Sequence, residues 1–432
     1  MARLSVAFAF VSAGAWVAGA TAVGGGAHAA TAGTAAAAEG REASTTPSLS
    51  TFASVLADDL DVVLFPATRR PPPRPLVTVA TRVRAEPAAV GAVLLDPARY
   101  RAALPSLVRA EVVAVRPALG RAANDGYGPE RLLAWELEIP LFNLKGRAWL
   151  SRQGDAVELT LVDGAFAPGH VSFRLAPLPG GQATVLASEV QVDAQSANWI
   201  IRRIARHDPW AETAMTAAAA WVLTRAVAVE AQTSGRSAPS RPSSPIVVPA
   251  VTALDGAALA SDAFAPLRRA GVVAAVRRTP TGRLNWVSAA AMISAPPPVV
   301  AAELATPETW TAFPGWKSVK RLPAEQAEGL RIEVQDNVAF VDLDGVWRVT
   351  YGGAARASAI AGATRGAVFA WQTYPAPGGA LAVLSMHPRL DASGYVARKM
   401  IAVEPLLEHG LALGLTYAAA AALADRLTDI RQ

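Results

Sequence analysis

The sequence contains no cysteine. Disulfides, cysteine nucleophiles, thiolate-ligated zinc and a lipoprotein anchor are therefore excluded. The fold has to be stabilised by burial of apolar side chains instead. A chain of 432 residues, of which 52% are hydrophobic, is long enough to bury such a core in two or three ordinary domains.

Histidine is scarce, and none of the five residues forms an H-x-x-H or H-E-x-x-H pair. We therefore expect no metal site. The sequence also lacks a G-x-S-x-G nucleophile motif, a phosphate-binding loop and a dinucleotide fingerprint. The motifs thus predict no cofactor and no set of catalytic residues.

Blocks of basic residues are absent as well. The chain carries 40 Lys and Arg against 35 Asp and Glu, a formal net charge of +5, and both signs are dispersed along it. Nucleic acid is disfavoured as a partner, because binding to its backbone requires clustered positive charge.

The first thirty residues have the organisation of an export signal. Arg3 supplies a short basic region, residues 4–23 are apolar, and Ala27-His28-Ala29 fits a small-x-small cleavage site. These features predict a signal peptide over residues 1–29, cleavage near Ala29, and a secreted or periplasmic protein. The alternative is an uncleaved N-terminal membrane anchor, because about twenty apolar residues can span a bilayer.

Two stretches of low complexity divide the remainder. Residues 30–49 are rich in Ala, Gly, Ser and Thr, and residues 231–249 are rich in Ser and Pro. The first is predicted to be disordered and the second to be a linker. Two blocks of similar length, residues 50–230 and 250–432, are left as the predicted domains.

The two blocks share an ordered series of similar residues. DPARYRAALPSLVRAEVV (96–113) and TPETWTAFPGWKSVK (306–320) have the same order of parts: a polar residue and proline, an aromatic, a second proline and a strand-like run. Further matches keep the same order: Pro87 with Pro296, Pro105 with Pro314, Leu144-Lys145-Gly146 with Leu343-Asp344-Gly345, Pro179-Gly180-Gly181 with Pro377-Gly378-Gly379, Asp193 with Asp391, and Glu212 with Glu408. The preserved order predicts a diverged internal duplication.

Each block has the same predicted plan. In the first, alternating apolar residues predict a strand over residues 76–85, followed by two short helices over residues 88–95 and 97–104. Six strands follow, at about 107–116, 131–139, 144–152, 156–162, 170–177 and 183–192, and a long helical stretch over 196–231 closes the block. The second block repeats this plan and ends in a helical stretch over 393–427.

A proline lies inside each final helical stretch. Pro209 follows Asp208 in the first block, and Pro405 follows Glu404 in the second. Because an interior proline removes a helix hydrogen bond and clashes with the preceding turn, we expect each final helix to bend or restart there.

The number and kind of elements predict the fold class. An antiparallel sheet needs one face covered, and the long helix is the only large element left to cover it. We therefore predict an α+β protein of two tandem domains, each a curved antiparallel sheet wrapped round a long C-terminal helix, with two short helices after the first strand. A cavity between sheet and helix would suit a small apolar ligand.

This order of elements, together with EPAAVGAVLLDPARYRAALPSLVRAEVV at residues 86–113, resembles the START/polyketide-cyclase-like superfamily (SRPBCC, the helix-grip fold). The branch that it resembles most is the coenzyme Q-binding and polyketide cyclase/dehydrase group. The resemblance covers residues 76–230, and residues 284–428 more loosely, with Thr306 in place of Asp96 and Trp310 in place of Tyr100. It implies binding of hydrophobic molecules in the cavity, and some members of the superfamily are enzymes.

Aromatic side chains are the predicted lining of the two cavities. The candidate ligand-binding residues are Trp135, Phe173, Trp199 and Trp210 in the first block, and Trp347, Phe369, Trp371 and Tyr395 in the second. The alternative for each is ordinary packing in the hydrophobic core.

Three functions are compatible with this pattern. The favoured one is an exported protein that is not an enzyme and binds a lipid, isoprenoid or polyketide-like molecule, with transient membrane contact as a further partner and the oligomeric state left open. The second is a cyclase or dehydratase in which only the first block is active, using Glu136, Asp163 or His207. If Trp135 faces the cavity, however, Glu136 and Glu138 face solvent. The third is a structural or interaction module whose cavities are filled by side chains.

Overall fold

The computed structural model describes residues 47–66, 74–117, 128–140, 142–207, 210–233, 248–254, 256–312, 316–323, 329–336, 344–352, 354–391 and 393–429. The predicted signal peptide, Asp208 and Pro209, and most of the two low-complexity stretches lie outside these residues. Residues Thr46–Gln432 belong to one compact unit. Two helices extend slightly past the predicted domain boundaries at residues 50 and 230. The first helix begins at Leu49, and the long helix of the first block continues to Thr233.

The described elements fall into two halves of similar order. The first half contains α1 (Leu49–Ala53), β1 (Leu60–Pro66), β2 (Leu76–Val83), α2 (Pro87–Leu94), α3 (Pro97–Ala103), β3 (Leu107–Arg116), β4 (Glu130–Ile139), β5 (Phe142–Gln153), β6 (Ala156–Gly164), β7 (Phe166–Pro177), β8 (Thr184–Asp193), a 3₁₀ turn (Ala194–Ser196), α4 (Trp199–His207) and α5 (Ala211–Thr233).

The second half contains a 3₁₀ turn (Val251–Ala253), α6 (Ala257–Ala260), a 3₁₀ turn (Asp262–Phe264), α7 (Ala265–Ala270), β9 (Gly271–Arg278), β10 (Leu284–Ile293), α8 (Pro297–Leu304), a 3₁₀ helix (Pro307–Ala312), β11 (Trp316–Arg321), β12 (Leu330–Asp336), β13 (Gly345–Tyr351), β14 (Ala354–Gly362), β15 (Val368–Ala376), β16 (Gly379–His387), α9 (Tyr395–Val403) and α10 (Leu407–Asp429).

All the named strands join one antiparallel sheet of sixteen strands, in the order β11-β12-β13-β14-β15-β16-β10-β9-β1-β2-β8-β7-β6-β5-β4-β3. The order of the second half is the reverse of the order of the first, and the halves meet where β1 pairs with β9. At this joint Val63 lies opposite Ala274. The predicted duplication is therefore visible as two matching half-sheets joined through their first strands.

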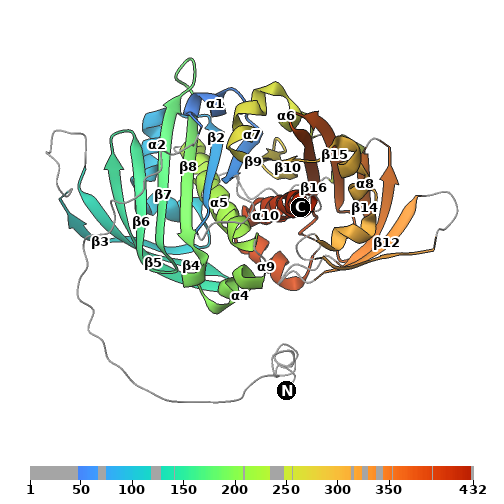
Figure 1. Cartoon of the computed structure of the whole chain (residues 1–432). Helices are drawn as coiled ribbons and strands as arrows, with labels where there is room; N and C mark the ends of the chain where they lie inside the picture. Colours follow the sequence, from blue (N-terminus) through green and yellow to red (C-terminus); the bar gives the residue numbers. More distant parts are fainter. Residues whose placement is uncertain are drawn as a thin grey trace, which may run out of the picture. The chain divides into compact units, whose positions relative to one another are not determined.

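Each half-sheet curves round its own long helix. The helix α5 contacts β2 and β8, and α10 contacts β10 and β16. Figure 1 shows α5 and α10 at the centre, with the outer strands of each half curving away from them. The predicted α+β fold of two tandem helix-grip units is thus confirmed by the arrangement of the elements, although a continuous sheet joins the two units.

The long helices are buried on several sides. One face of α5 packs on the sheet and another packs on α10, so its sequence is apolar almost all round. By length and composition alone, Ala211–Thr233 and Leu407–Leu427 could cross a membrane. Their most apolar windows are 61% and 72% buried inside the fold, however, as in the core helices of a soluble protein.

The contact between the long helices depends on small residues. A Cβ added at Gly410 would lie 3.2 Å from the Cβ of Ala218, and one added at Gly414 would lie 3.3 Å from the Cβ of Ala214. At the same joint Phe65 stacks on Tyr417, with ring centroids 3.8 Å apart. The two halves therefore share a packed core in addition to their shared sheet.

The final helix of each half is interrupted where a proline was expected to interrupt it. In the first half α4 ends at His207 and α5 begins at Ala211. In the second half α9 ends at Val403 and α10 begins at Leu407, around Pro405. The strand β1 was not predicted. Residues 60–66 (LDVVLFP) form a short apolar run without alternation, which by periodicity alone cannot be told from a buried helix segment. In the structure this run is almost entirely buried.

Candidate functional site

Two glycine pairs mark equivalent positions in the halves. Gly146 lies opposite Gly164, Gly345 lies opposite Gly362, and the register shifts immediately beyond each pair. A Cβ added at Gly164 or Gly362 would lie 2.2 Å or 2.5 Å from a backbone carbonyl oxygen, so only glycine fits. Because both halves keep this β-bulge, their inward-facing side chains can be compared position by position.

The corner after each pair of short helices is also equivalent. The Tyr100 hydroxyl donates a hydrogen bond to the Leu94 carbonyl at 2.7 Å, and the Trp310 indole N–H donates one to the Leu304 carbonyl at 3.2 Å. Each acceptor is the last residue of the preceding helix. Burial raises the pKa of Tyr100, so its hydroxyl stays protonated as a donor. The replacement of Tyr by Trp therefore preserves the polar contact that closes the corner.

The interior of the second half is filled by its own aromatic side chains. The ring centroids of Trp347 and Phe369 are 5.3 Å apart, and those of Trp310 and Phe369 are 5.4 Å apart. Trp316 packs edge-on against Trp310 at 5.9 Å. Trp310, Trp347, Phe369 and Trp371 are all at most 4% exposed. Aromatic packing of this density favours a closed core.

The first half is more open at the matching positions. On β4, Trp135 lies opposite Gly146, and its counterpart on β12 is Val334, opposite Gly345. Val334 is 1% exposed, whereas the larger Trp135 is only half-buried. Leu137, the next inward-facing residue of β4, is half-buried too.

The strand β6 shows the same difference. Its inward-facing Leu159 and Leu161 pack against the core but are only half-buried. At the matching positions of β14, Ala357 and Ala359 are 1% and 5% exposed. Larger apolar side chains are thus less covered in the first half than smaller ones in the second. The concave face of the first half carries apolar surface that its own side chains do not cover.

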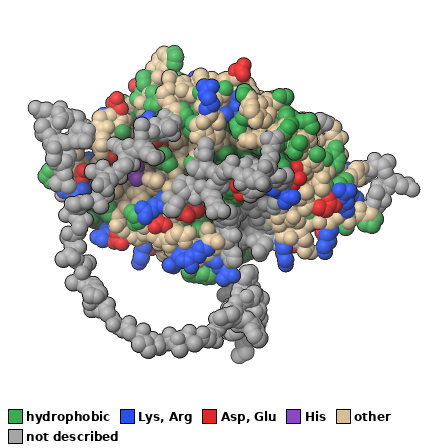
Figure 2. All heavy atoms as spheres, viewed as in Figure 1, with side chains coloured by type: hydrophobic (Ala, Val, Ile, Leu, Met, Phe, Trp, Pro, Cys, Tyr) green, Lys and Arg blue, Asp and Glu red, His purple; other side chains and the backbone are tan. Residues whose placement is uncertain are grey.

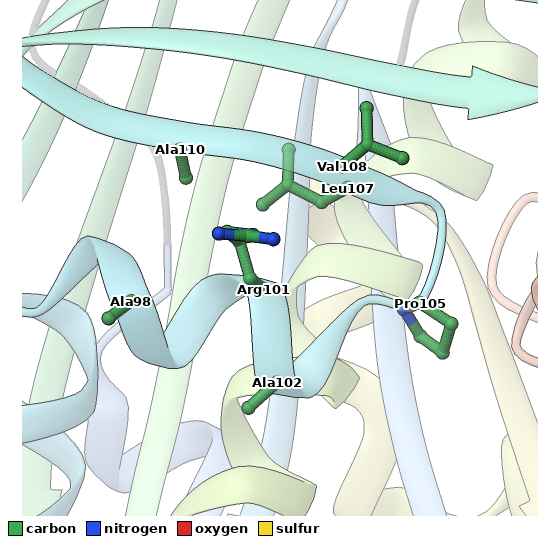
Figure 3. Close-up of a pocket in the computed structure, with 7 residues that line it drawn as sticks. All are labelled: Ala98, Arg101, Ala102, Pro105, Leu107, Val108 and Ala110. Carbon is green, nitrogen blue, oxygen red and sulfur yellow. The ribbon is translucent and has the colours of Figure 1, made fainter.

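A pocket of about 440 Å³ opens beside this face, between α3 and β3. Figure 3 shows the Arg101 guanidinium between the helix and the strand, with Leu107 and Ala110 on the strand side. A second pocket of about 280 Å³ is lined by Arg131 and Leu150 beside the end of α2. None of the eight predicted aromatics lines either pocket.

The predicted ligand-binding aromatics separate into four groups, three of which pack inside the fold. Trp135 and Phe173 lie in the interior of the first half. Trp210 lies at the joint between the halves, 6.3 Å from the ring of Tyr417. Trp347, Phe369 and Trp371 belong to the closed interior of the second half.

Trp199 and Tyr395 do not face either interior. Each is 67% exposed, at the first residue of α4 and of α9. Neither ring lines the two pockets described above.

Of the three acid or base candidates, Glu136 and Asp163 have described side chains, and each is engaged by a neighbouring side chain on the sheet. Glu136 accepts a hydrogen bond from Asn143 at 3.0 Å, on the face of β4 opposite Trp135. Asp163 is 57% exposed and pairs with Arg147 at 2.6 Å, which lowers the pKa of its carboxyl. The side chain of His207 lies outside the described residues. In the part of the chain that the structure describes, no group of three metal-ligating side chains is found.

A buried polar network crosses the joint between the halves. Asp61 of β1 is 0% exposed and accepts hydrogen bonds from both Nε and Nη2 of Arg278 of β9, each at 3.1 Å. It also accepts from the Thr81 hydroxyl at 2.6 Å and from the Trp221 indole at 3.2 Å. Sequence reasoning missed this network, because no local motif links a carboxylate to an arginine more than two hundred residues away.

A second buried acid lies at the start of α10. Burial raises the pKa of Glu408 to about 7, and the nearby charge of Asp391 adds to the shift. The matching Glu212 of α5 also has a raised pKa, for which burial is again the largest cause, with a smaller contribution from Asp193. The repeated Asp and Glu noted in the sequence therefore form a repeated pair of acids at the base of each long helix.

Replacing Glu408 with Gln is expected to make stability less dependent on pH. The unfolded chain releases the Glu408 proton near pH 4.5 and the folded chain near pH 7, so wild-type stability is lost as the pH rises through this window. The variant should become more stable than wild type by up to about 3 kcal/mol between pH 5 and pH 8. Urea unfolding at several pH values measures this difference.

A Glu111→Gln variant, on the exposed part of β3, controls for the change in net charge. His409 makes stability depend on pH in the opposite sense, because burial lowers its pKa to about 3. This contribution is the same in wild type and in the Glu408 variant, so it cancels in the difference between them. A constant difference between the Glu408 variant and wild type across pH 5 to 8 would contradict the raised pKa.

Comparison with known proteins assigns no activity to the chain. No protein-family model and no curated protein matches the sequence. Among solved structures, the chain is similar to a START superfamily protein from Mycobacterium smegmatis, with 21% identity, coverage of 27% of this chain and 75% of that one, and a TM-score of 0.23. It is also similar to the lipid transfer and protein localization domain of human StarD13, with 16% identity, coverage of 41% and 86%, and a TM-score of 0.29.

A third similar structure has two domains. The di-domain aromatase/cyclase of the steffimycin biosynthetic pathway is 12% identical, with coverage of 79% of this chain and 97% of that one, and a TM-score of 0.25. Likenesses this distant assign no ligand and no reaction. The order of the elements and the strand pairing themselves give the chain its tandem helix-grip arrangement.

Proposed function

We propose that the protein binds a hydrophobic small molecule in its first half and that the second half is a structural partner. The observation that supports this most is the unequal burial of matching positions: Leu159 and Leu161 are half-buried, whereas Ala357 and Ala359 are buried. Exposed apolar surface on a concave face is favourable to cover with an apolar ligand. The aromatic packing of the second half supports a closed core there.

The ligand in this proposal carries an anionic end. Arg101 lies at the opening between α3 and β3, and the described ion pairs give it no carboxylate partner. A guanidinium at the edge of an apolar pocket favours a carboxylate or a phosphate. A lipid, an isoprenoid acid or a polyketide-like acid would each satisfy both requirements. Export of the protein remains part of the proposal, because the N-terminal segment has the organisation of a signal peptide.

Filling the concave face is expected to abolish most of this binding. In a Leu161→Trp variant the larger side chain occupies the space that leaves Leu161 half-buried. We expect the affinity for a fluorescent fatty acid to fall at least about tenfold, since the probe loses apolar contact area. Fluorescence titration of the purified protein, without vesicles, measures the dissociation constant.

Thr160→Trp is the matched control, because Thr160 is the adjacent residue of β6 and its side chain is exposed on the opposite face. An equal loss of affinity in both variants would show that the probe does not occupy the concave face. Arg101→Gln should weaken binding of the fatty acid about tenfold and leave binding of the matching fatty alcohol unchanged. Equal loss for both probes would remove the anionic end from the proposal.

A further inference from the structure

The two most exposed large apolar side chains occupy the same place in the two halves. Trp199 and Tyr395 are each 67% exposed, and the next among the described residues is Val115 at 62%. Trp199 is the first residue of α4 and Tyr395 is the first residue of α9. Exposure of a large aromatic ring is unfavourable in water, so its occurrence at both equivalent positions indicates a surface that becomes covered.

Basic side chains accompany both aromatics at helical spacing. Arg202, Arg203 and Arg206 lie three, four and seven residues after Trp199, and Arg398 and Lys399 lie three and four residues after Tyr395. These spacings place each set on the aromatic face of its helix. None of the five forms an ion pair with a carboxylate among the described side chains, and the Lys399 ammonium lies 5.6 Å from the Tyr395 ring centroid.

The two helices present this face together. Their other faces pack on one apolar cluster, to which Ile201 and Ala205 of α4 and Met400 of α9 contribute. Figure 1 shows α4 and α9 next to each other at the lower edge, and Figure 2 shows Lys and Arg side chains gathered along that edge. We define the α4–α9 face as Trp199, Arg202, Arg203 and Arg206 with Tyr395, Arg398 and Lys399.

We propose that the α4–α9 face docks on an anionic lipid bilayer. The five cations provide the attraction to negatively charged headgroups, which acts over roughly a Debye length and weakens as salt is added. Trp and Tyr then suit the boundary between headgroups and acyl chains, because each ring has an apolar body and a polar tip. A nucleic acid or an acidic protein would be attracted by the charges but would not require two projecting aromatic rings.

The docking face lies next to the pocket of the first half. Glu404, at the end of α9, accepts hydrogen bonds from the backbone N–H and the hydroxyl of Ser106, at 3.4 Å and 3.1 Å. Ser106 directly follows Pro105, which lines the pocket between α3 and β3. A docked protein would thus hold this pocket close to the bilayer. Docking itself does not depend on the proposed binding of a ligand.

Vesicle binding by the full chain tests this proposal. The wild-type protein should bind vesicles of phosphatidylcholine with phosphatidylglycerol about tenfold or more tightly than vesicles of phosphatidylcholine alone, and added NaCl should remove the difference. A Trp199→Ala/Tyr395→Ala variant and an Arg203→Gln/Lys399→Gln variant should each lose about tenfold in affinity for the anionic vesicles. The apolar segment at residues 4–23 is common to every variant, so differences between variants report on the α4–α9 face.

Two matched variants complete the test. Lys317→Gln/Lys320→Gln removes the same charge from the far edge of the sheet, and Val115→Ala/Met292→Ala removes exposed apolar surface elsewhere. Both should bind like wild type. Equal binding of wild type to neutral and anionic vesicles, or equal losses in the matched variants, would overturn the proposal. Tighter binding to an acidic polypeptide than to anionic vesicles, lost in the aromatic variant, would assign the face to a protein partner instead. Probe binding without vesicles should be unchanged in every variant, which separates this test from that of the proposed function.

Discussion

Replacing Asp61 with alanine is expected to lower the free energy of unfolding by about 3–5 kcal/mol, because it leaves buried donors without their acceptor. Arg278 is 6% exposed and directs two N–H groups at the Asp61 carboxylate. The Thr81 hydroxyl and the Trp221 indole lose the same acceptor. Urea unfolding at neutral pH, followed by circular dichroism, measures the change.

The position of Asp61 makes this loss a test of the joint as well. Asp61 lies on β1 and Arg278 on β9, so the pair connects the two strands through which the halves of the sheet meet. Asp59→Ala is the matched control: Asp59 pairs with Arg277 at 2.8 Å across the same joint, but the two side chains are 42% and 30% exposed. We expect that variant to lose less than about 1 kcal/mol.

A double variant separates the charge from the packing. Asp61→Leu with Arg278→Leu should be more stable than Asp61→Ala, because the buried Arg278 guanidinium is removed together with its acceptor. Arg225 is then the buried cation that remains beside Thr81. Equal losses in Asp61→Ala and Asp59→Ala would mean that the buried network does not stabilise the joint.

Elements with a local signature were predictable from the sequence. Asp96 caps α3 by accepting from the backbone N–H of Ala98, and Leu104 and Pro105 follow its end, as the order of residues indicated. The corner at Trp310 matches the corner at Tyr100 even in its hydrogen bond. The side-chain cap is not repeated, because the hydroxyl of Thr306, at the position of Asp96, donates to the Ala302 carbonyl at 3.2 Å instead.

The pairing of the halves could not be predicted in the same way. The contact between β1 and β9 depends on residues about two hundred positions apart, and the run at residues 60–66 has no alternation to mark it as a strand. The small residues Gly410 and Gly414 permit the close approach of α10 to Ala218 and Ala214, but glycines in an alanine-rich helix carry no sign of their partner. Contacts of this kind become visible only in the folded chain.

The candidate site was predictable in composition but not in orientation. The aromatic residues were predicted to line ligand cavities, and Trp135 and Phe173 lie in the interior of the first half. Trp199 and Tyr395 have the same residue types, but they lie before the breaks in the final helices, and the direction of a helix after a break is set by tertiary packing. Likewise, residue type alone could not reveal that Trp347 and Phe369 pack against each other and close their half.

The second large effect is expected from Gly164→Ala, which should lower the free energy of unfolding by about 3 kcal/mol or more through the combination of an unfavourable φ and a steric clash. Gly164 has a φ of +84°. A Cβ there would lie 2.2 Å from the Lys145 carbonyl oxygen and 2.5 Å from the Cα of Gly146, and neither backbone atom can move without separating β5 from β6. Thermal and chemical unfolding both measure the loss.

Gly154→Ala isolates the contribution of the clash. Gly154 also has a positive φ, +61°, but an added Cβ would meet nothing within 4 Å. We therefore expect it to cost only about 1 kcal/mol, and the difference between the two variants reports the close approach of the strands at the bulge.

Gly362→Ala should match Gly164→Ala, because its φ of +90° and its 2.5 Å approach to the Asp344 carbonyl repeat the same geometry in the second half. If only Gly164→Ala also weakens binding of the fatty acid probe, the bulge beside Leu161 positions the ligand-binding face, whereas its counterpart in the closed half serves stability alone.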